Sequence, residues 1–364
     1  MSKAAELAAL IGSQTALSNR NLIINGAMQV AQRGTSTTGV TSTTTYGADR
    51  FALQLNSIGT YTLSQSSTAP DGFSNSFKID CTTADASPAA GDYSILTHKV
   101  EAQNLQHLGY GTSSAKAITL SFYLRSNKTG SIGLVIRQID NSNKMFSKEV
   151  TINAADTWER KTVSIPADTS GVINDDNGTG LDISWWLNAG STYSGGSEMT
   201  TWGTETNANK YLGDLDIGAL TTDEFYITGV QLEVGEQATP FEHRSIGDEL
   251  ARCKRYFQRH DNDNSAYRWF GSGYTTSTTA ASIGVALNPP MRAIPSFSLN
   301  VGASNFIFDQ SGGAKACSAI TSSFSSNTMA RLFLTIGTTT ASTPGWLASD
   351  GTSSLRALDF DAEL

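Results

Sequence analysis

Short runs of apolar residues, many of them alternating with polar ones, recur along most of the chain and constrain its fold more than any other feature. Examples are residues 118–124, 132–136 and 161–165. Gly, Asn and Pro stand between the runs, and helical periodicity is nearly absent between Asn21 and Glu242. Many short strands separated by turn-forming residues are typical of a β-sandwich or jelly roll. We therefore predict an all-β protein.

The clearest boundary within the chain follows one of these strands. Residues 230–234 alternate between apolar and polar, Gly235 and Pro240 then end the strand, and a short amphipathic helix begins at Ile246. We predict, in chain order, a short N-terminal helix over 1–20, a jelly-roll β domain over 21–245, a connector helix and linker over 246–264, and a smaller C-terminal β-sandwich over 265–364.

Three segments occur in the same order as in a known family. They are NLIINGAMQVAQRG at residues 21–34, GVQLEVG followed by TPFE and GDELARCKRYF at residues 229–257, and DAEL at the C-terminus. In these segments the chain resembles tail-fibre and other appendage proteins of tailed bacteriophages, and its strand layout resembles the jelly roll of carbohydrate-binding modules. The resemblance implies a virion protein made in the cytoplasm of a bacterial host. It also implies a homo-oligomer, for which we expect a trimer, in contact with other virion proteins.

The N-terminal helix has two possible roles. Its apolar stripe includes Leu7, Leu10, Ile11 and Leu17. A helix this short is marginal alone in water, so the stripe should pack against a partner. That partner is either the chain's own β domain or, as the family resemblance implies, the virus particle to which the helix would anchor the protein.

Charge and hydropathy exclude two classes of partner. The formal net charge is −8, and the basic residues are scattered apart from Arg252, Lys254, Arg255 and Arg259, which we place on the connector helix. Nucleic-acid binding needs clustered Lys and Arg, so we expect none. We recognise neither a secretion signal nor a membrane-spanning segment and expect no membrane insertion. The three cysteines lack metal-ligand spacing and are predicted to be reduced and buried.

The sequence contains no recognisable catalytic motif. The four histidines are dispersed, and no HExxH, GxSxG or phosphate-binding loop occurs. Two carboxylates that cleave a glycosidic bond can be far apart in sequence, so a glycan-cleaving enzyme stays open as an alternative. We nevertheless expect that the protein is not an enzyme.

Exposed aromatic rings are the best candidates for a binding site, because sugar rings stack on them while polar groups bind the hydroxyls. We select four aromatic residues in or near turn-rich segments: Trp186, Tyr193, Trp202 and Trp346. Trp185 and Trp186 are adjacent in a predicted strand, so they must face opposite sides. The alternative for all of these rings is packing in the core or between subunits.

The run Asn-Asp-Asp-Asn-Gly-Thr-Gly-Leu-Asp at residues 174–182 is rich in oxygen ligands. It lacks the spacing of an EF-hand calcium loop, which needs a bidentate Glu at its twelfth position. We expect an ordinary turn and no cofactor, and keep a structural calcium ion as an alternative.

Taken with the resemblance, these features predict a tail-fibre-like virion appendage that assembles as an oligomer and recognises polysaccharide on the host surface. The alternative is a capsid decoration or adaptor protein with a purely structural role.

Overall fold

The computed structural model describes residues 19–41, 43–263, 265, 267–323, 325–351 and 355–364. The anchoring residues Leu7, Leu10, Ile11 and Leu17 lie outside this range. The chain divides into two compact units, the first comprising the described residues up to Glu249 together with Leu364, and the second Leu250–Glu363. Both consist mainly of antiparallel strands, which confirms the all-β fold class. Among the described helices, none has the length and apolarity that crossing a membrane requires.

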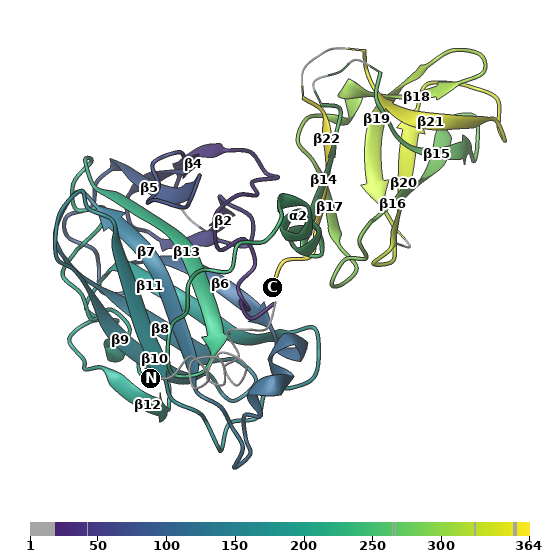
Figure 1. Cartoon of the computed structure of the whole chain (residues 1–364). Coiled ribbons are helices and arrows are strands. Elements are labelled where there is room, and N and C mark those ends of the chain that lie inside the picture. The colour runs from purple at the N-terminus through teal and green to yellow at the C-terminus, as the bar shows by residue number, and fades with distance from the viewer. Residues whose placement is uncertain (1–18, 42, 264, 266, 324, 352–354) are drawn as a thin grey trace. The chain divides into compact units, whose positions relative to one another are not determined.

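Two antiparallel sheets form the first unit (Figure 1). The six-stranded sheet has the order β1 (Ser36–Val40), β4 (Thr60–Ser66), β5 (Ser76–Thr83), β13 (Glu224–Val234), β7 (Ile118–Ser126) and β10 (Glu159–Ile165). The seven-stranded sheet has the order β12 (Met199–Gly203), β9 (Lys144–Ile152), β8 (Gly130–Gln138), β11 (Thr179–Ala189), β6 (Tyr93–Glu101), β3 (Ala52–Asn56) and β2 (Thr43–Tyr46). The short 3-10 helix η2 (Ala102–Leu108) lies in the connection from β6 to β7, and η3 (Asn207–Asn209) lies in the connection from β12 to β13. Both connections join the two sheets.

A single apolar cluster joins the inner faces of the two sheets. It contains Phe77, Phe122 and Phe225 from the six-stranded sheet and Leu134 and Trp185 from the seven-stranded one, all fully buried. Because strand residues alternate between faces, each sheet contributes every second side chain to this layer. The outer faces therefore carry a separate set of side chains, and the candidate site lies on one of them.

Two of the segments that carry the family resemblance interlock within this unit. Asn21 donates from Nδ2 to the Val230 carbonyl oxygen at 3.2 Å, and its Oδ1 accepts from the Leu232 N–H at 3.1 Å. The Val230 N–H in turn donates to the Gly26 carbonyl oxygen at 2.9 Å. Glu242 accepts from the Asn21 N–H at 2.8 Å. The N-terminal segment and strand β13 are thus one hydrogen-bonded assembly, which gives both segments a structural role.

The second unit contains a closed barrel and a small sheet (Figure 1). The barrel has the order β15 (Trp269–Thr275), β16 (Ala280–Ala286), β20 (Met329–Ile336), β19 (Lys315–Ser322), β18 (Phe306–Gln310) and β21 (Pro344–Ser349). The sheet has the order β14 (Phe257–Asp261), β22 (Ala357–Asp361) and β17 (Ser296–Leu299), and η4 (Ala303–Asn305) precedes β18. We expected a sandwich here; the structure refines this, because β15 pairs with both β16 and β21 and so closes the ring.

The connector is shorter than predicted. Helix α2 spans Ile246–Lys254, and the Ser245 hydroxyl accepts from the Asp248 N–H at 3.2 Å, as an N-terminal helix cap does. Part of the predicted linker is instead strand β14, because its residues pair with β22. Arg259 is therefore a strand residue and not a helix residue, and it binds the Asp359 carboxylate at 2.7 and 2.6 Å.

His98 on β6 is a titratable group inside the first unit. Its ring is 1% exposed and lies 4.6 Å from the ring of Phe51. Burial and the neighbouring Arg50 guanidinium lower the pKa of His98 well below its ordinary value, so the folded protein keeps the imidazole neutral. In the unfolded chain its pKa is about 6.5. Only the unfolded state therefore binds this proton as the pH falls below that value, and stability decreases with it.

We expect His98 to make the free energy of unfolding fall by up to about 1.4 kcal/mol per pH unit below roughly pH 6.5. Urea unfolding at about pH 7.5 and about pH 5.5 measures the effect. His98→Gln should reduce this pH dependence relative to the parent. Equal pH dependence in His98→Gln and the parent would contradict the assignment.

Candidate functional site

Strand β11 presents adjacent tryptophans to opposite faces of its sheet. Trp185 is fully buried between the sheets, with its ring 5.6 Å from that of Phe122. Trp186 belongs to a second, smaller apolar cluster that includes Ile95 and Val135 and not the inter-sheet core. The alternation predicted from the sequence is confirmed, and it places Trp186 on the outer face of the seven-stranded sheet.

Two tyrosines join Trp186 in a cluster of three rings. The ring centroid of Tyr93 lies 5.7 Å from that of Trp186, that of Tyr193 lies 5.1 Å from Trp186, and the two tyrosines are 5.5 Å apart. Trp186 is only 5% exposed, whereas both tyrosines are half-buried. The tyrosines therefore offer the accessible ring surface, and the ring of Trp186 packs against both of them.

A loop crosses the outer face beside this cluster. It approaches β8 so closely that a Cβ on Gly133 would lie 2.1 Å from the Lys210 carbonyl oxygen. Gly133 is paired with Trp186 across the sheet, so the glycine makes room for the loop at that point. As a result the Lys210 ammonium lies 5.7 Å from the Trp186 ring centroid and 5.6 Å from that of Tyr193.

Four charged side chains form a compensated network next to the rings. Arg137 binds the Asp182 carboxylate at 2.5 Å and Glu205 at 3.2 Å, and Lys210 binds Glu205 at 2.6 Å. The Thr97 hydroxyl donates to Asp182 at 2.7 Å. With two cations and two anions, the network is formally neutral.

The pKa values of the network favour the charged forms. Burial alone would raise the pKa of Glu205, but hydrogen bonds and charge from Lys210 and Arg137 outweigh it and lower that pKa. Burial would lower the pKa of Arg137, but Asp182 and Glu205 outweigh it and raise that pKa. Glu205 is therefore ionised at neutral pH and is a poor proton donor there.

The three rings line a cleft of about 140 Å³ together with Arg137, Asp182, Lys210, Thr97, Gln54, Ile95 and Ser184. That volume is below the roughly 300 Å³ at which pockets for drug-sized ligands begin, so the cleft can hold only a small ligand or one part of a larger one. Among the described residues, nothing hydrogen-bonds the Gln54 amide, the hydroxyls of Tyr93 and Tyr193, or the buried indole N–H of Trp186. The cleft thus combines aromatic surface with hydrogen-bonding groups that are still available.

Trp202 lies elsewhere and differs from the expectation of a loop residue. It belongs to strand β12, its ring packs 6.0 Å from Tyr110 and 6.2 Å from Phe146, and its N–H donates to the Pro166 carbonyl oxygen at 2.7 Å. It closes the edge of the core, because pairing of β12 with β9 draws its segment onto the sheet. We therefore leave Trp202 out of the site.

Trp346 is exposed as expected, but it belongs to the second unit and to strand β21 instead of a turn. It is not part of the cleft.

Sequence reasoning missed most of the polar groups of the cleft. One signal was present, because Asp182, Ser184 and Trp186 alternate on β11 and so share a face. Arg137, Lys210 and Gln54 come from other strands and a loop, and only the strand pairing brings them together.

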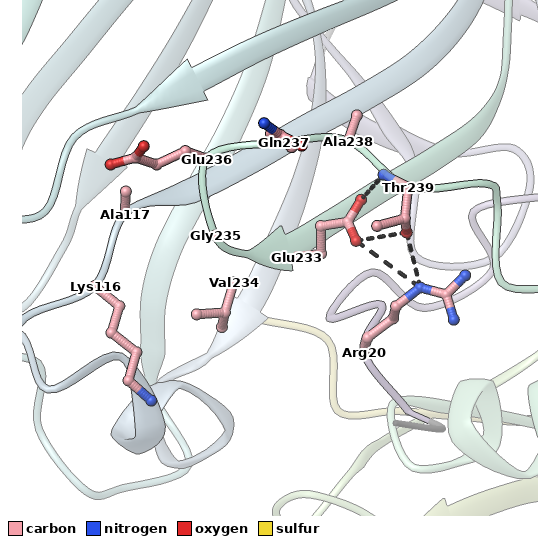
Figure 2. Close-up of a pocket in the computed structure, with 10 residues that line it drawn as sticks. All are labelled: Arg20, Lys116, Ala117, Glu233, Val234, Gly235, Glu236, Gln237, Ala238 and Thr239. Carbon is pink, nitrogen blue, oxygen red and sulfur yellow. Dashed lines mark hydrogen bonds and ion pairs between the residues drawn. The ribbon is translucent and has the colours of Figure 1, made fainter. Parts of the chain in front are cut away.

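A larger hollow, of about 600 Å³, lies where β13 ends (Figure 2). Its buried polar groups already bind one another: Glu233 accepts from the Thr239 N–H at 2.9 Å and from its hydroxyl at 2.7 Å, and Arg20 donates to that hydroxyl at 2.9 Å. These contacts hold the loop after β13 in place. We therefore do not treat the hollow as a binding site.

Residues 175–178 form a bend in which the Asp176 carboxylate accepts from the Gly178 N–H at 2.8 Å, and residues 179–182 begin strand β11. Within the part of the chain that the structure describes, no three His, Cys, Asp or Glu side chains are grouped to hold a metal ion.

Comparisons with known proteins give structural matches only. No protein-family model matches the chain, and no curated protein matches it. Solved structures that match include the enzymatically active domain of tailspike protein 4 of bacteriophage CBA120, with 12% identity over 59% of this chain and a TM-score of 0.31. This chain covers 21% of that protein, about a fifth of its length.

Carbohydrate-binding modules are also among the matches. The family 11 module of Clostridium thermocellum, solved with a β-1,3-1,4-mixed-linked tetrasaccharide, shows 13% identity over 55% of this chain and 99% of its own, with a TM-score of 0.28. The C-terminal family 22 module of Xyn10B from the same organism shows 10% identity over 52% of this chain and 89% of its own, with a TM-score of 0.29. At such scores the likeness does not assign a function, so the proposal below rests on the residues of the site.

Proposed function

We propose that this chain is a non-enzymatic, glycan-binding component of a tailed-bacteriophage appendage that assembles as an oligomer. The observation that carries glycan binding is the cleft on the seven-stranded sheet, where three aromatic rings meet hydrogen-bonding groups without protein partners. A pyranose has apolar faces and a rim of hydroxyls, so it needs both kinds of group at once. The appendage role and the oligomer rest on the three sequence segments that resemble phage appendage proteins.

Charge supports a neutral sugar as the ligand. The charged side chains that line the cleft, Arg137, Asp182 and Lys210, form a neutral network with Glu205, so the cleft offers no net attraction for an anionic glycan. Affinity should then depend little on ionic strength, since screening mainly weakens interactions between uncompensated charges.

The same network supports binding without cleavage. Glycosidases pair a carboxylic acid of raised pKa with a second carboxylate. Here the pKa of Glu205 is lowered, and Asp182 is held by Arg137 and Thr97. Incubation with bacterial surface polysaccharide should therefore release no reducing sugar, and sustained release would reject this part of the proposal.

The direct test is binding of the full-length protein to a printed array of bacterial surface polysaccharides. Tyr193→Ala should weaken binding roughly tenfold, because it removes an accessible stacking ring and leaves the inter-sheet core intact. Tyr123→Ala removes a half-buried tyrosine from the six-stranded sheet and serves as the matched control. If the parent binds no glycan, or if Tyr193→Ala binds as the parent does, the cleft is not the site and the purely structural alternative gains support.

A further inference from the structure

The second unit presents two tryptophans as a stacked pair on its surface. Trp269 and Trp346 are 57% and 39% exposed, and their ring centroids lie 4.9 Å apart with 12° between the planes. Neither belongs to the apolar core of this unit. Exposed aromatic rings grouped in this way indicate a surface that binds a ligand or another protein.

A bulge in β15 brings the two rings to the same side. The pairing of β15 with β21 shifts between Trp269 and Gly271, so the intervening Phe270 is an extra residue and turns inward, 5.6 Å from the core ring of Phe306. In a regular strand without a bulge, Trp269 and Ser272 are three positions apart and would face opposite sides. The bulge therefore creates the pair, and Tyr274, 52% exposed, lies further along the same face of β15.

Oxygen groups flank the pair across the strands. Trp346 is paired with Ser272 on one side and with Asp309 on the other. Directly opposite residues in antiparallel strands have Cβ atoms about 5 Å apart and point to the same face. Among the described residues, nothing hydrogen-bonds the Ser272 hydroxyl, the Asp309 carboxylate or the two indole N–H groups. The stacked tryptophan pair is thus flanked by hydrogen-bond donors and acceptors that no described residue uses.

The architecture and charge of this face restrict what can occupy it. The barrel strands that carry the pair are hydrogen-bonded on both sides, so a partner cannot bind by adding a strand there. Arg268, which precedes Trp269, is already engaged by Asp263. The Asp309 carboxylate therefore disfavours an anionic ligand and favours a ligand that donates hydrogen bonds.

We infer that the Trp269–Trp346 face is a second glycan-binding surface, which takes a neutral sugar chain. One pyranose would stack on the exposed face of the indole pair, and its hydroxyls would donate to Asp309 and Ser272. This surface is formed by the second unit alone. It does not depend on the cleft of the first unit.

A printed array of neutral glucans, galactans and mannans, probed with the full-length protein, tests the inference. The double variant Trp269→Ala/Trp346→Ala should bind at least tenfold more weakly to a subset of these glycans, since it removes both stacking rings. Asp309→Asn should bind that subset more weakly by a smaller factor. Ile294→Ala, which removes a 66% exposed aliphatic side chain from the same unit, is the control and should bind as the parent does. Circular dichroism checks that each variant is folded.

The outcomes separate this inference from the proposed function. Loss of one subset of glycans in the double variant and of another in Tyr193→Ala supports both surfaces. If Tyr193→Ala loses all binding and the double variant loses none, the second surface is wrong while the cleft stands. If the double variant loses all binding and Tyr193→Ala loses none, the cleft is wrong while the second surface stands. If the double variant binds glycans as the parent does but has a different mass in light scattering, the pair is an interface between copies and the inference is wrong.

Discussion

Gly26→Ala is expected to destabilise the first unit by about 3 kcal/mol, or to prevent its folding. A Cβ at position 26 would lie 2.1 Å from the Val230 carbonyl oxygen, which is far inside contact distance. The oxygen belongs to the backbone of β13, so it cannot rotate away as a flexible side chain would. The alanine must instead push the N-terminal segment off β13 and weaken the bonds that join Asn21, Gly26 and Val230.

Urea unfolding followed by circular dichroism measures this effect, and Gly91→Ala is the matched control. Gly91 belongs to the same unit, and a Cβ there would meet no atom within 4 Å. Its replacement should change the free energy of unfolding by less than about 0.5 kcal/mol. If Gly26→Ala unfolds at the same urea concentration as the parent, the two segments are not held together as described.

The interlocking gives a structural reason for two of the segments singled out in the sequence. The segment at residues 21–34 contains Asn21 and Gly26, and the segment at residues 229–257 contains Val230, Leu232 and Glu242. Each of these residues binds or closely approaches the other segment. A sequence pattern that arises for this reason reports how the sandwich is closed. It carries no information about a ligand, which would contact the side chains of the outer face.

Strand periodicity predicted the all-β fold and the opposite faces of Trp185 and Trp186, because both depend only on residues that are neighbours in sequence. It could not predict which strands pair. Closure of the barrel and the short connector both follow from such pairings, between β15 and β21 and between β14 and β22. The position of Trp202 follows in the same way from the pairing of β12 with β9.

Strand periodicity also could not predict which side chains meet on the two candidate surfaces, because that depends on strand pairing too. The neutral network needs Arg137 on β8, Asp182 on β11 and a loop that carries Lys210, and Gly133 admits that loop. On the second unit, one extra residue at Phe270 decides that Trp269 meets Trp346. Both arrangements depend on register, which a one-residue shift reverses.

Trp185→Ala is expected to reduce the free energy of unfolding of the first unit by about 3 to 5 kcal/mol. The ring is fully buried between the sheets and packs against Phe122 and Phe51, so its removal leaves a cavity that the two sheets cannot close. Trp158→Ala is the control. That tryptophan is half-buried and lies 6.2 Å from Tyr226, outside the inter-sheet core, so its loss should cost less than about 1.5 kcal/mol.

The neighbouring residue should behave in the opposite way. Trp186→Phe retains an aromatic ring in the small outer cluster, so we expect a loss of stability of less than about 1.5 kcal/mol. It removes the indole N–H and changes the support under Tyr93 and Tyr193, so glycan binding to the cleft should weaken. Folded Trp185→Ala should bind like the parent at a temperature well below its melting transition. If instead Trp185→Ala is as stable as the parent, or if Trp186→Phe binds glycans unchanged, the division of β11 into a core face and a binding face is wrong.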